Sequence, residues 1–384
     1  MTSSIPKEGF PLFLSEAQLE VLSALCETFI PSLSNEATEK MVQDFAESPE
    51  HAVELRAFAK RSGKDNDFPR LLAEFMQERL PVKELQQISL ALTVLGTSPG
   101  TYLMSGRHWA PFTSLSVADR EKVVLEWGSS RIGQKRDLHS GIKGLCFQLY
   151  YSYLSAQSNH QTNPNWKAIQ YPGPDPERNG EKFKQSQESY VDLKMLQIDH
   201  DNTVLEFDAV VIGSGCGGGV MAAELSQAGF SVLVVDKGPY VPPSQLALTE
   251  YEAYNTMFEQ KAVLPTKTPG AFLLAGSCFG GGSSVNWACS LRTPHHVREE
   301  WATKYGLTHF TSPAFARSLD TVCARVNVTE GKDVTHDQQN SKMLIGAKKL
   351  GLAAKVAGQN IKKGAKHECG WCGFGCRYGE KQGS

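Results

Sequence analysis

The sequence predicts an α/β protein in two parts, a Rossmann-like domain preceded by an all-helical amino-terminal domain. Three observations support this prediction. Residues 207–240 hold a glycine fingerprint between two apolar, β-branched runs, a pattern typical of a nucleotide-binding strand, turn and helix. Apolar residues in the first part recur at helical spacing. Between the two, residues 163–187 are rich in proline and charge, which indicates a linker.

The amino-terminal domain, residues 1–162, is expected to consist of amphipathic helices. Ser15 and Gln18 form a capping-box start, and Pro31 ends the apolar repeat that follows. Residues 85–104 are the most apolar stretch, but glutamine, glycine and proline interrupt it. A membrane span needs about 20 predominantly apolar residues, so a buried helix and turn is the favoured interpretation. Peripheral membrane contact without a span stays open.

Two more helices are expected before the linker, which is placed at residues 163–203. Ser116 and Asp119 mark the start of the first. The second, residues 142–154, is aromatic and apolar with a tyrosine cluster. A core helix is favoured there, and the alternative is a lining for an apolar substrate or an anchor at a membrane interface.

The second domain, residues 204–384, opens with the fingerprint. Residues 209–212 predict a buried parallel strand. The first glycine of G-x-G-x-x-G permits a tight turn, the second lets the backbone approach a pyrophosphate, and the third lets helix and strand pack together. The helix amino terminus offers N–H groups and a positive dipole end to the phosphates. The expected cradle consists of Gly213, Ser214, Gly215, Cys216, Gly217, Gly218 and Gly219.

Asp236 ends the second expected strand, residues 231–235. Its distance from the first glycine is close to the ~20 residues expected for an acid that binds a ribose hydroxyl. A nucleotide with an adenosine ribose is therefore predicted to bind, although the fingerprint alone does not separate FAD from NAD. After it, residues 240–268 are expected to form a partly helical excursion.

A second glycine cluster, GSCFGGGSSVNWACS, occupies residues 276–290. Three consecutive glycines followed by serines and an asparagine do not suit a helix or the interior of a central strand. Backbone of this kind can lie against a flat ligand in a cleft shared with the first cluster. Gly281, Ser283 and Asn286 are predicted to border that ligand.

The pairing of VVIGSGCGGG with a downstream GGGSSVN resembles the glucose-methanol-choline (GMC) family of flavin oxidoreductases. Further stretches are similar to its long-chain fatty alcohol oxidase branch, and the resemblance covers residues 14 to 384. These stretches are LSEAQLEVLSALCETFIPS, NPNWKAIQYPGP, NSKMLIGAKKLGL and ECGWCGFGCRYGEKQGS.

This resemblance implies FAD as cofactor, with the first motif around its adenosine diphosphate and the second close to the flavin. It implies oxidation of a long-chain primary alcohol to the aldehyde by hydride transfer to the flavin N5, with molecular oxygen reduced to hydrogen peroxide. A membrane-associated intracellular location is the family expectation. The sequence itself shows no signal peptide and no clear transmembrane span.

Members of that branch continue to a carboxy-terminal part that carries a histidine general base. The sequence is therefore expected to be truncated before its catalytic portion, and no catalytic residue is assigned. His295 and His296 are interpreted as surface or supporting residues. Two alternatives stay open, namely a GMC dehydrogenase that uses another acceptor, such as a quinone or cytochrome, and a non-catalytic FAD-binding fragment without the base.

Composition narrows the possible partners. A net charge of −2 with 21% charged residues gives no global field that favours nucleic acid. Nine cysteines in a chain without a signal peptide indicate reduced thiols. Cys369, Cys372 and Cys376, with His367 nearby, have spacings that a metal could use, but only one C-x-x-C pair is present. No metal site is assigned, and structural or redox-active cysteines are favoured.

Overall fold

The structure is a computed structural model that describes residues 12–152 and 163–383, without residues 172, 175, 189, 191, 194, 199–203, 265, 267–270, 272, 335, 363 and 365–367. The chain divides into two compact units. Unit 1 comprises residues 1–175 and 263–273, and unit 2 comprises residues 176–262 and 274–384. The break after residue 175 falls within the linker placed at residues 163–203. The assignment of residues 263–273 to unit 1 has no counterpart in the sequence pattern.

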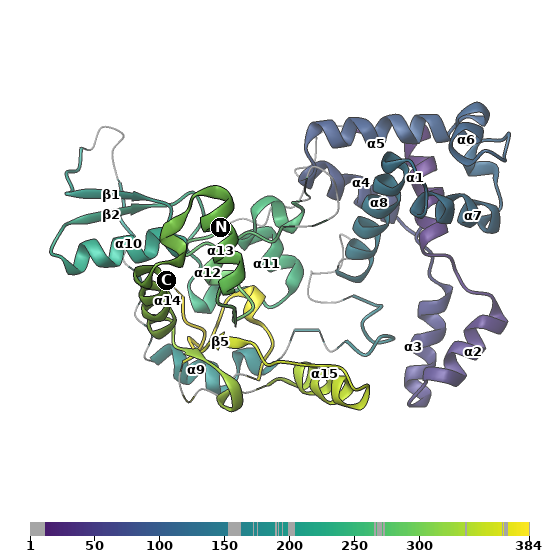
Figure 1. Cartoon of the computed structure of the whole chain (residues 1–384). Coiled ribbons are helices and arrows are strands. Elements are labelled where there is room, and N and C mark those ends of the chain that lie inside the picture. Colours follow the sequence, from purple (N-terminus) through teal and green to yellow (C-terminus); the bar gives the residue numbers. More distant parts are fainter. Residues whose placement is uncertain are drawn as a thin grey trace. The chain divides into compact units, whose positions relative to one another are not determined.

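Unit 1 contains helices and no strand among its described residues (Figure 1). Serine side chains start several of them, since Ser15, Ser34, Ser48 and Ser116 each accept a hydrogen bond from a backbone N–H in the first turn. For residues 1–11 and 153–162, which lie outside the described part, the all-helical domain stays a prediction. The helices are α1 (Glu16–Phe29), α2 (Asn35–Phe45), α3 (Pro49–Lys60), α4 (Phe68–Arg79), α5 (Val82–Leu95), α6 (Ser98–Ser105), η1 (Phe112–Ser114), α7 (Val117–Gly128) and α8 (Gly133–Ser152).

The core of unit 1 forms where α1 meets α4, α5, α7 and α8. Trp127 stacks on Phe112, with ring centroids 6.2 Å apart, and its Nε1 donates to the carbonyl oxygen of Met104 at 3.1 Å. The expected helix and turn over residues 85–104 are present as α5 and α6. The core interpretation of α8 is confirmed for the described residues, because one side of this helix is buried. Its buried residues are Ile142, Leu145, Cys146, Leu149 and Tyr150.

None of the described helices combines the length and the apolar character required to cross a membrane. The apolar run of residues 85–104 is divided between α5 and α6. The structure therefore agrees with the interpretation of this run as a helix and turn rather than one span, with the difference that a second short helix, α6, follows the turn.

The described residues of unit 2 contain two small sheets. Strands β1 (Ala209–Ile212) and β2 (Val232–Val235) pair in parallel, with Ala209 opposite Val232 and Ile212 opposite Val235. Helix α10 (Cys216–Gln227) contacts both strands and runs beside them (Figure 1). The second sheet has the order β3-β5-β4 and is antiparallel. Its strands are β3 (Cys289–Ser290), β4 (Val328–Thr329) and β5 (Gly358–Asn360).

The remaining elements of unit 2 are short helices and 3-10 turns. The helices are α9 (Glu181–Glu188), α11 (Glu250–Met257), α12 (Gly282–Val285), α13 (His295–Tyr305), α14 (Pro313–Arg325) and α15 (Gln338–Lys349). The turns are η2 (Pro176–Asn179), η3 (Pro243–Gln245), η4 (Glu259–Ala262), η5 (Thr308–Thr311), η6 (Gly331–Asp333) and η7 (Cys372–Phe374). In η4, Gln260, Lys261 and Ala262 have φ angles of 45°, 53° and 67°, so three successive non-glycine residues are left-handed.

The prediction of a buried strand over residues 209–212 is wrong with respect to burial. The parallel pairing is present, but Val210 is 57% exposed and Ile212 is 88% exposed. Alternate side chains of a strand point to opposite faces, and along β1 exposed residues alternate with half-buried ones. We infer that α10 covers one face of the pair, and that the other face meets no comparable cover among the described residues.

Candidate cofactor-binding site

The chain itself requires a glycine at the first and third positions of the fingerprint. Gly213 has φ +92°, and its N–H donates to the carbonyl oxygen of Val235 at 2.7 Å, which closes the turn after β1 against β2. A Cβ atom on Gly218 would lie 1.8 Å from the carbonyl oxygen of Gly213. Helix α10 can therefore pack against the turn only if position 218 has no side chain.

The glycines between these two have no such internal cause. Gly215 has φ −63°, which any residue adopts, and a Cβ atom on Gly215 or Gly217 would meet nothing within 4 Å. Gly215 caps α10 without a side-chain hydrogen bond. The space in front of this helix amino terminus is therefore open to a ligand, beside N–H groups and the positive end of the helix dipole. These residues fit the pyrophosphate of a dinucleotide such as FAD. Cys216, the first residue of α10, is exposed. Gly219 donates its N–H to the carbonyl oxygen of Gly215 at 2.8 Å, which forms the first turn of the helix.

Asp236 lies directly after β2 and holds the first loop in place. Its Oδ2 accepts from the N–H of Ser214 at 2.7 Å and from the Ser214 hydroxyl at 2.6 Å, and its Oδ1 accepts from the N–H of Gly238 at 2.7 Å. Burial acts to raise the pKa of Asp236, but the hydrogen bonds from Ser214 and Gly238 outweigh it, so the pKa lies below its ordinary value. Sequence reasoning missed this contact with Ser214, and binding of a ribose hydroxyl by Asp236 stays a prediction.

The second glycine loop lies directly against the first. The N–H of Gly280 donates to Ser214 Oγ at 2.8 Å, so buried Ser214 connects Asp236 to this loop. Gly281 has φ +52°, and a Cβ atom on it would lie 3.0 Å from the Cα of Gly215. The structure thus brings together the two glycine clusters, whose contacting residues Gly215 and Gly281 are 66 positions apart in the sequence.

Ser283 and Asn286 hold the second loop through local hydrogen bonds. The hydroxyl of Ser283 donates to the carbonyl oxygen of Gly280 at 2.7 Å, and Asn286 Nδ2 donates to the carbonyl oxygen of Ser283 at 2.9 Å. The N–H of Ala288 donates to Asn286 Oδ1 at 2.9 Å. Ser283 is buried and Asn286 is half-buried. The location of Ser283 and Asn286 beside a flavin stays a prediction. The hydrogen bonds of both residues show that they hold the loop in its conformation.

Two further glycines complete this arrangement, and sequence reasoning missed both. A Cβ atom on Gly238 would lie 2.6 Å from the carbonyl oxygen of Ser277, and one on Gly276 would lie 2.3 Å from the carbonyl oxygen of Gly281. Each glycine allows two backbone segments to touch. The signal available in the sequence was weak, since Gly238 stands alone two positions after Asp236 and Gly276 opens the second cluster.

Comparison with known proteins identifies this part of the chain. Residues 208–384 match the model of the GMC oxidoreductase family. Residues 208–384 therefore form a GMC oxidoreductase domain, which includes most of unit 2. The match begins just before β1 and includes both glycine loops, so the resemblance stated from the two motifs is confirmed.

The similarity to individual relatives extends beyond this domain and covers nearly the whole chain. The chain is 30% identical to the long-chain-alcohol oxidase FAO1 of Arabidopsis thaliana, over 99% of its own length and 53% of that protein. It is 32% identical to the long-chain-alcohol oxidase FAO4A of the same plant, over 95% of its length and 55% of the relative. An uncharacterized GMC-type oxidoreductase of Sinorhizobium fredii is 31% identical over 46% of this chain. The chain spans about half the length of the plant relatives.

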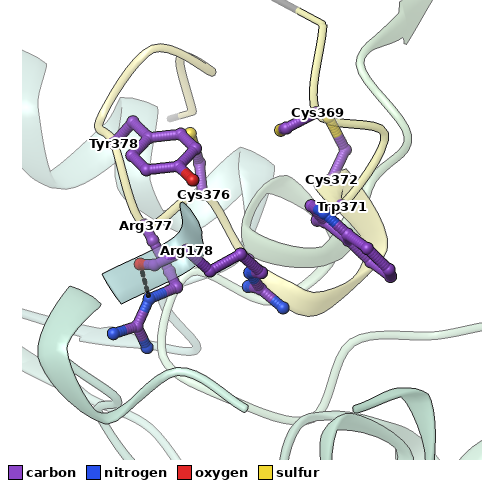
Figure 2. Close-up of a pocket in the computed structure, with 8 residues that line it drawn as sticks. Arg178, Cys369, Trp371, Cys372, Cys376, Arg377 and Tyr378 are labelled. Atoms are coloured by element: carbon purple, nitrogen blue, oxygen red, sulfur yellow. Dashed lines mark hydrogen bonds between the residues drawn. The ribbon is translucent and has the colours of Figure 1, made fainter. Parts of the chain in front are cut away.

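The cysteine cluster of the GMC domain surrounds a cavity of about 10 Å³, which has room for about one water molecule. Figure 2 shows Cys369 and Cys372 on one side of this cavity and Cys376 on the other. Burial raises the pKa of the Cys369 thiol, and it raises the pKa of Cys372 to about 12. Both thiols are therefore protonated at neutral pH, which favours the structural over the redox-active interpretation.

The described residues of the cysteine cluster are not arranged as the ligands of a metal ion. No group of three or more histidine, cysteine, aspartate or glutamate side chains is arranged to hold a metal ion there. His367, the fourth potential ligand named from the sequence, lies outside the described residues. The sequence-based metal hypothesis thus gains no geometric support.

His295 and His296 begin α13, outside the two glycine loops. Both are exposed, and His295 Nε2 lies 3.1 Å from Glu299 Oε1 one helical turn further on. Their interpretation as surface residues agrees with this exposure. The geometry described for the GMC domain assigns no catalytic base to either of them.

Proposed function

We propose that this chain is an FAD-dependent oxidoreductase that oxidises long-chain primary alcohols to aldehydes and uses molecular oxygen as acceptor. One observation supports it most strongly, namely the contact of the two glycine loops. The Cβ position of Gly281 lies 3.0 Å from Gly215 Cα, while Gly215 and Gly217 face open space at the start of α10. The substrate class comes from the printed names of the plant relatives.

In this proposal residues 213–219 and the amino terminus of α10 hold the pyrophosphate. Asp236 accepts a hydrogen bond from a ribose hydroxyl on a lone pair that Ser214 and Gly238 leave available. Gly281, Ser283 and Asn286 border the flavin. When bound, FAD would supply the acceptor for a hydride from the alcohol carbon, and oxygen would then reoxidise it and yield hydrogen peroxide.

The cofactor assignment is tested by titrating the purified chain with FAD and following flavin fluorescence. The variant Gly215→Val places a branched side chain in the space assigned to the pyrophosphate, and we expect it to weaken binding at least about tenfold. Gly346→Val is the matched control, because Gly346 lies in α15 with nothing within 4 Å of its Cβ position. If the unchanged chain binds no FAD, or if Gly215→Val binds as tightly as the control, the assignment is wrong.

The reaction is tested on the FAD-loaded chain under anaerobic conditions. A long-chain primary alcohol should bleach the flavin absorption, and admitted oxygen should restore it with formation of hydrogen peroxide. Recovery with a quinone but not with oxygen would identify a dehydrogenase in place of an oxidase. Bound flavin that the alcohol does not bleach would contradict alcohol oxidation by this chain and would support the fragment alternative.

A further inference from the structure

Lys381 is a buried cation in contact with the second glycine loop. Only 8% of this residue is exposed. Its ammonium group donates to the carbonyl oxygen of Ser284 at 2.8 Å, of Asn286 at 2.9 Å and of Cys372 at 2.9 Å. These acceptors belong to two segments, since Ser284 and Asn286 follow the three glycines and Cys372 begins η7. One side chain thus joins the glycine loop to the cysteine-rich segment.

The backbone around Lys381 is fixed independently of its side chain. Lys381 forms an isolated antiparallel β-bridge with Ile361, the residue that follows β5. On either side, Lys362 N donates to the carbonyl oxygen of Glu380 at 2.7 Å, and Gln382 N donates to that of Asn360 at 2.8 Å. The ammonium group is therefore presented to the glycine loop from backbone that is hydrogen-bonded to residues 360–362.

Other close contacts join the same two segments. A Cβ atom on Gly383 would lie 3.2 Å from Ser283 Oγ, and one on Gly373 would lie 2.9 Å from Trp287 Nε1. Buried Ala288, Ile361 and Cys372 form a small apolar cluster at this junction. Residues 372–383 thus pack under the loop that carries Gly281 and Ser283.

The chemistry of the site favours a positioning role. Removing an ammonium group from water is costly unless its hydrogen bonds are replaced, and here three carbonyl oxygens replace them. Burial lowers the pKa of Lys381, and the neighbouring cysteines act in the opposite direction. An apolar side chain would fill this space without the desolvation cost, so the particular contribution of lysine is to hold the three carbonyl groups in fixed places.

We propose that Lys381 is a positioning residue that couples the docking of residues 372–383 to the binding of FAD, because it fixes the glycine loop that borders the cofactor. The proposal rests on FAD binding as proposed above. Coupling between two sites is reciprocal. FAD must therefore stabilise the docked segment to the same degree that the docked segment favours FAD.

The first test uses the unchanged chain. Two thiols are alkylated with and without saturating FAD, namely Cys376 in the docked segment and Cys369, which precedes the segment and lines the same cavity. The rates are read by mass spectrometry of the peptides. We expect FAD to slow alkylation of both at least about fivefold, the lower limit of typical coupling. Cys323 in α14, half-buried like these two, is the internal control and should keep its rate. Equal rates with and without FAD would overturn the proposal without any variant.

The second test compares Lys381→Met with Lys304→Met, which removes an exposed lysine from the i,i+4 pair with Glu300 in α13. Lys381→Met should weaken FAD binding at least about tenfold and abolish the protection of Cys369 and Cys376. Lys304→Met should keep both properties. Circular dichroism checks that each variant is folded, and if Lys381→Met is not, the alkylation of the unchanged chain decides.

The outcomes separate this proposal from the one on which it rests. If the unchanged chain binds no FAD, both proposals are overturned. If it binds FAD and Lys381→Met retains full affinity and full protection, only the coupling through Lys381 is overturned. Protection lost in Lys381→Met alone would support it, because direct shielding of the thiols by the cofactor would survive wherever FAD still binds.

Discussion

Helix α1 of unit 1 and the nucleotide motif of unit 2 are stabilised in opposite ways. Over 14 residues α1 buries six, among them Leu22 and Leu25. Over 12 residues α10 buries none, and neither does either of the strands that it contacts. Apolar side chains removed from water stabilise the first region. The second relies on close backbone contacts at glycines and on the hydrogen bonds of Ser214 and Asp236. The region around α1 is thus stabilised by its own buried side chains. The region around α10 is a backbone scaffold with few buried side chains, and its open surface suits contact with a ligand or another segment.

The largest effect should come from the core of unit 1. Leu22 is fully buried in α1, so Leu22→Ala removes packed methyl groups and leaves a cavity. We expect the free energy of unfolding to fall by about 2–5 kcal/mol. Leu90 in α5 is 65% exposed and is the matched control, for which Leu90→Ala should cost less than about 1 kcal/mol. Urea denaturation of both variants measures the difference, and equal losses would contradict the core assigned to α1.

A middle-sized effect should come from a methyl group added to the scaffold. In Gly218→Ala the new Cβ would lie 1.8 Å from the carbonyl oxygen of Gly213, so α10 must shift away from the turn. We expect a loss of about 1–3 kcal/mol, as for overpacked sites. Gly217→Ala adds the same group one residue earlier, into open space. It should stay within about 1 kcal/mol of the unchanged protein, as alanine suits a helix better than glycine. Thermal unfolding that ranks the two variants in reverse would refute this packing.

The smallest effect concerns charge. The pKa of Asp236 is lowered in the folded chain, so its carboxylate adds stability above its ordinary pKa of about 3.9, and this stability is lost as the pH falls through the folded value. Asp236→Asn should therefore cost about 1 kcal/mol near neutral pH, a modest figure because the residue is only partly buried. The difference from the unchanged protein should shrink below about pH 4.

Denaturation curves at several pH values measure this dependence. Asp44→Asn, at an exposed position of α2, is the control for loss of one negative charge and should change stability less at neutral pH. A cost of Asp236→Asn that stays constant into the acid range would show that its hydrogen bonds do not depend on the charge.

The sequence predicted the local parts of the second region well. The order strand, glycine turn, helix and strand is present, and Gly213 and Gly218 occur where the turn and the packing demand glycine. Spacing alone was sufficient here, because these contacts join residues that are close in the chain. Asp236 is also found at the end of β2, although its contact with Ser214 depends on a side chain that the fingerprint leaves unspecified.

The non-local parts could not be predicted in the same way. Ile212 reads as a core residue, but its burial depends on what covers the sheet and not on its own strand. Gly238 matters because a segment about 40 residues further along the chain touches it, and Gly276 matters because its own loop folds back against it at Gly281. Lys381 has the residue type that is usually exposed, and only the fold shows that three carbonyl groups surround its ammonium group.

The left-handed run in η4 has a consequence for how the chain folds. Gln260, Lys261 and Ala262 all have positive φ, and each residue that is not glycine loses about 1–2 kcal/mol in that conformation. An unfolded chain therefore rarely forms this turn, and burial of Met257 and Ala262 in one apolar cluster must offset the cost. We expect the turn to form late, after the transition state for folding. Changes at these three positions would then alter the unfolding rate and leave the folding rate nearly constant.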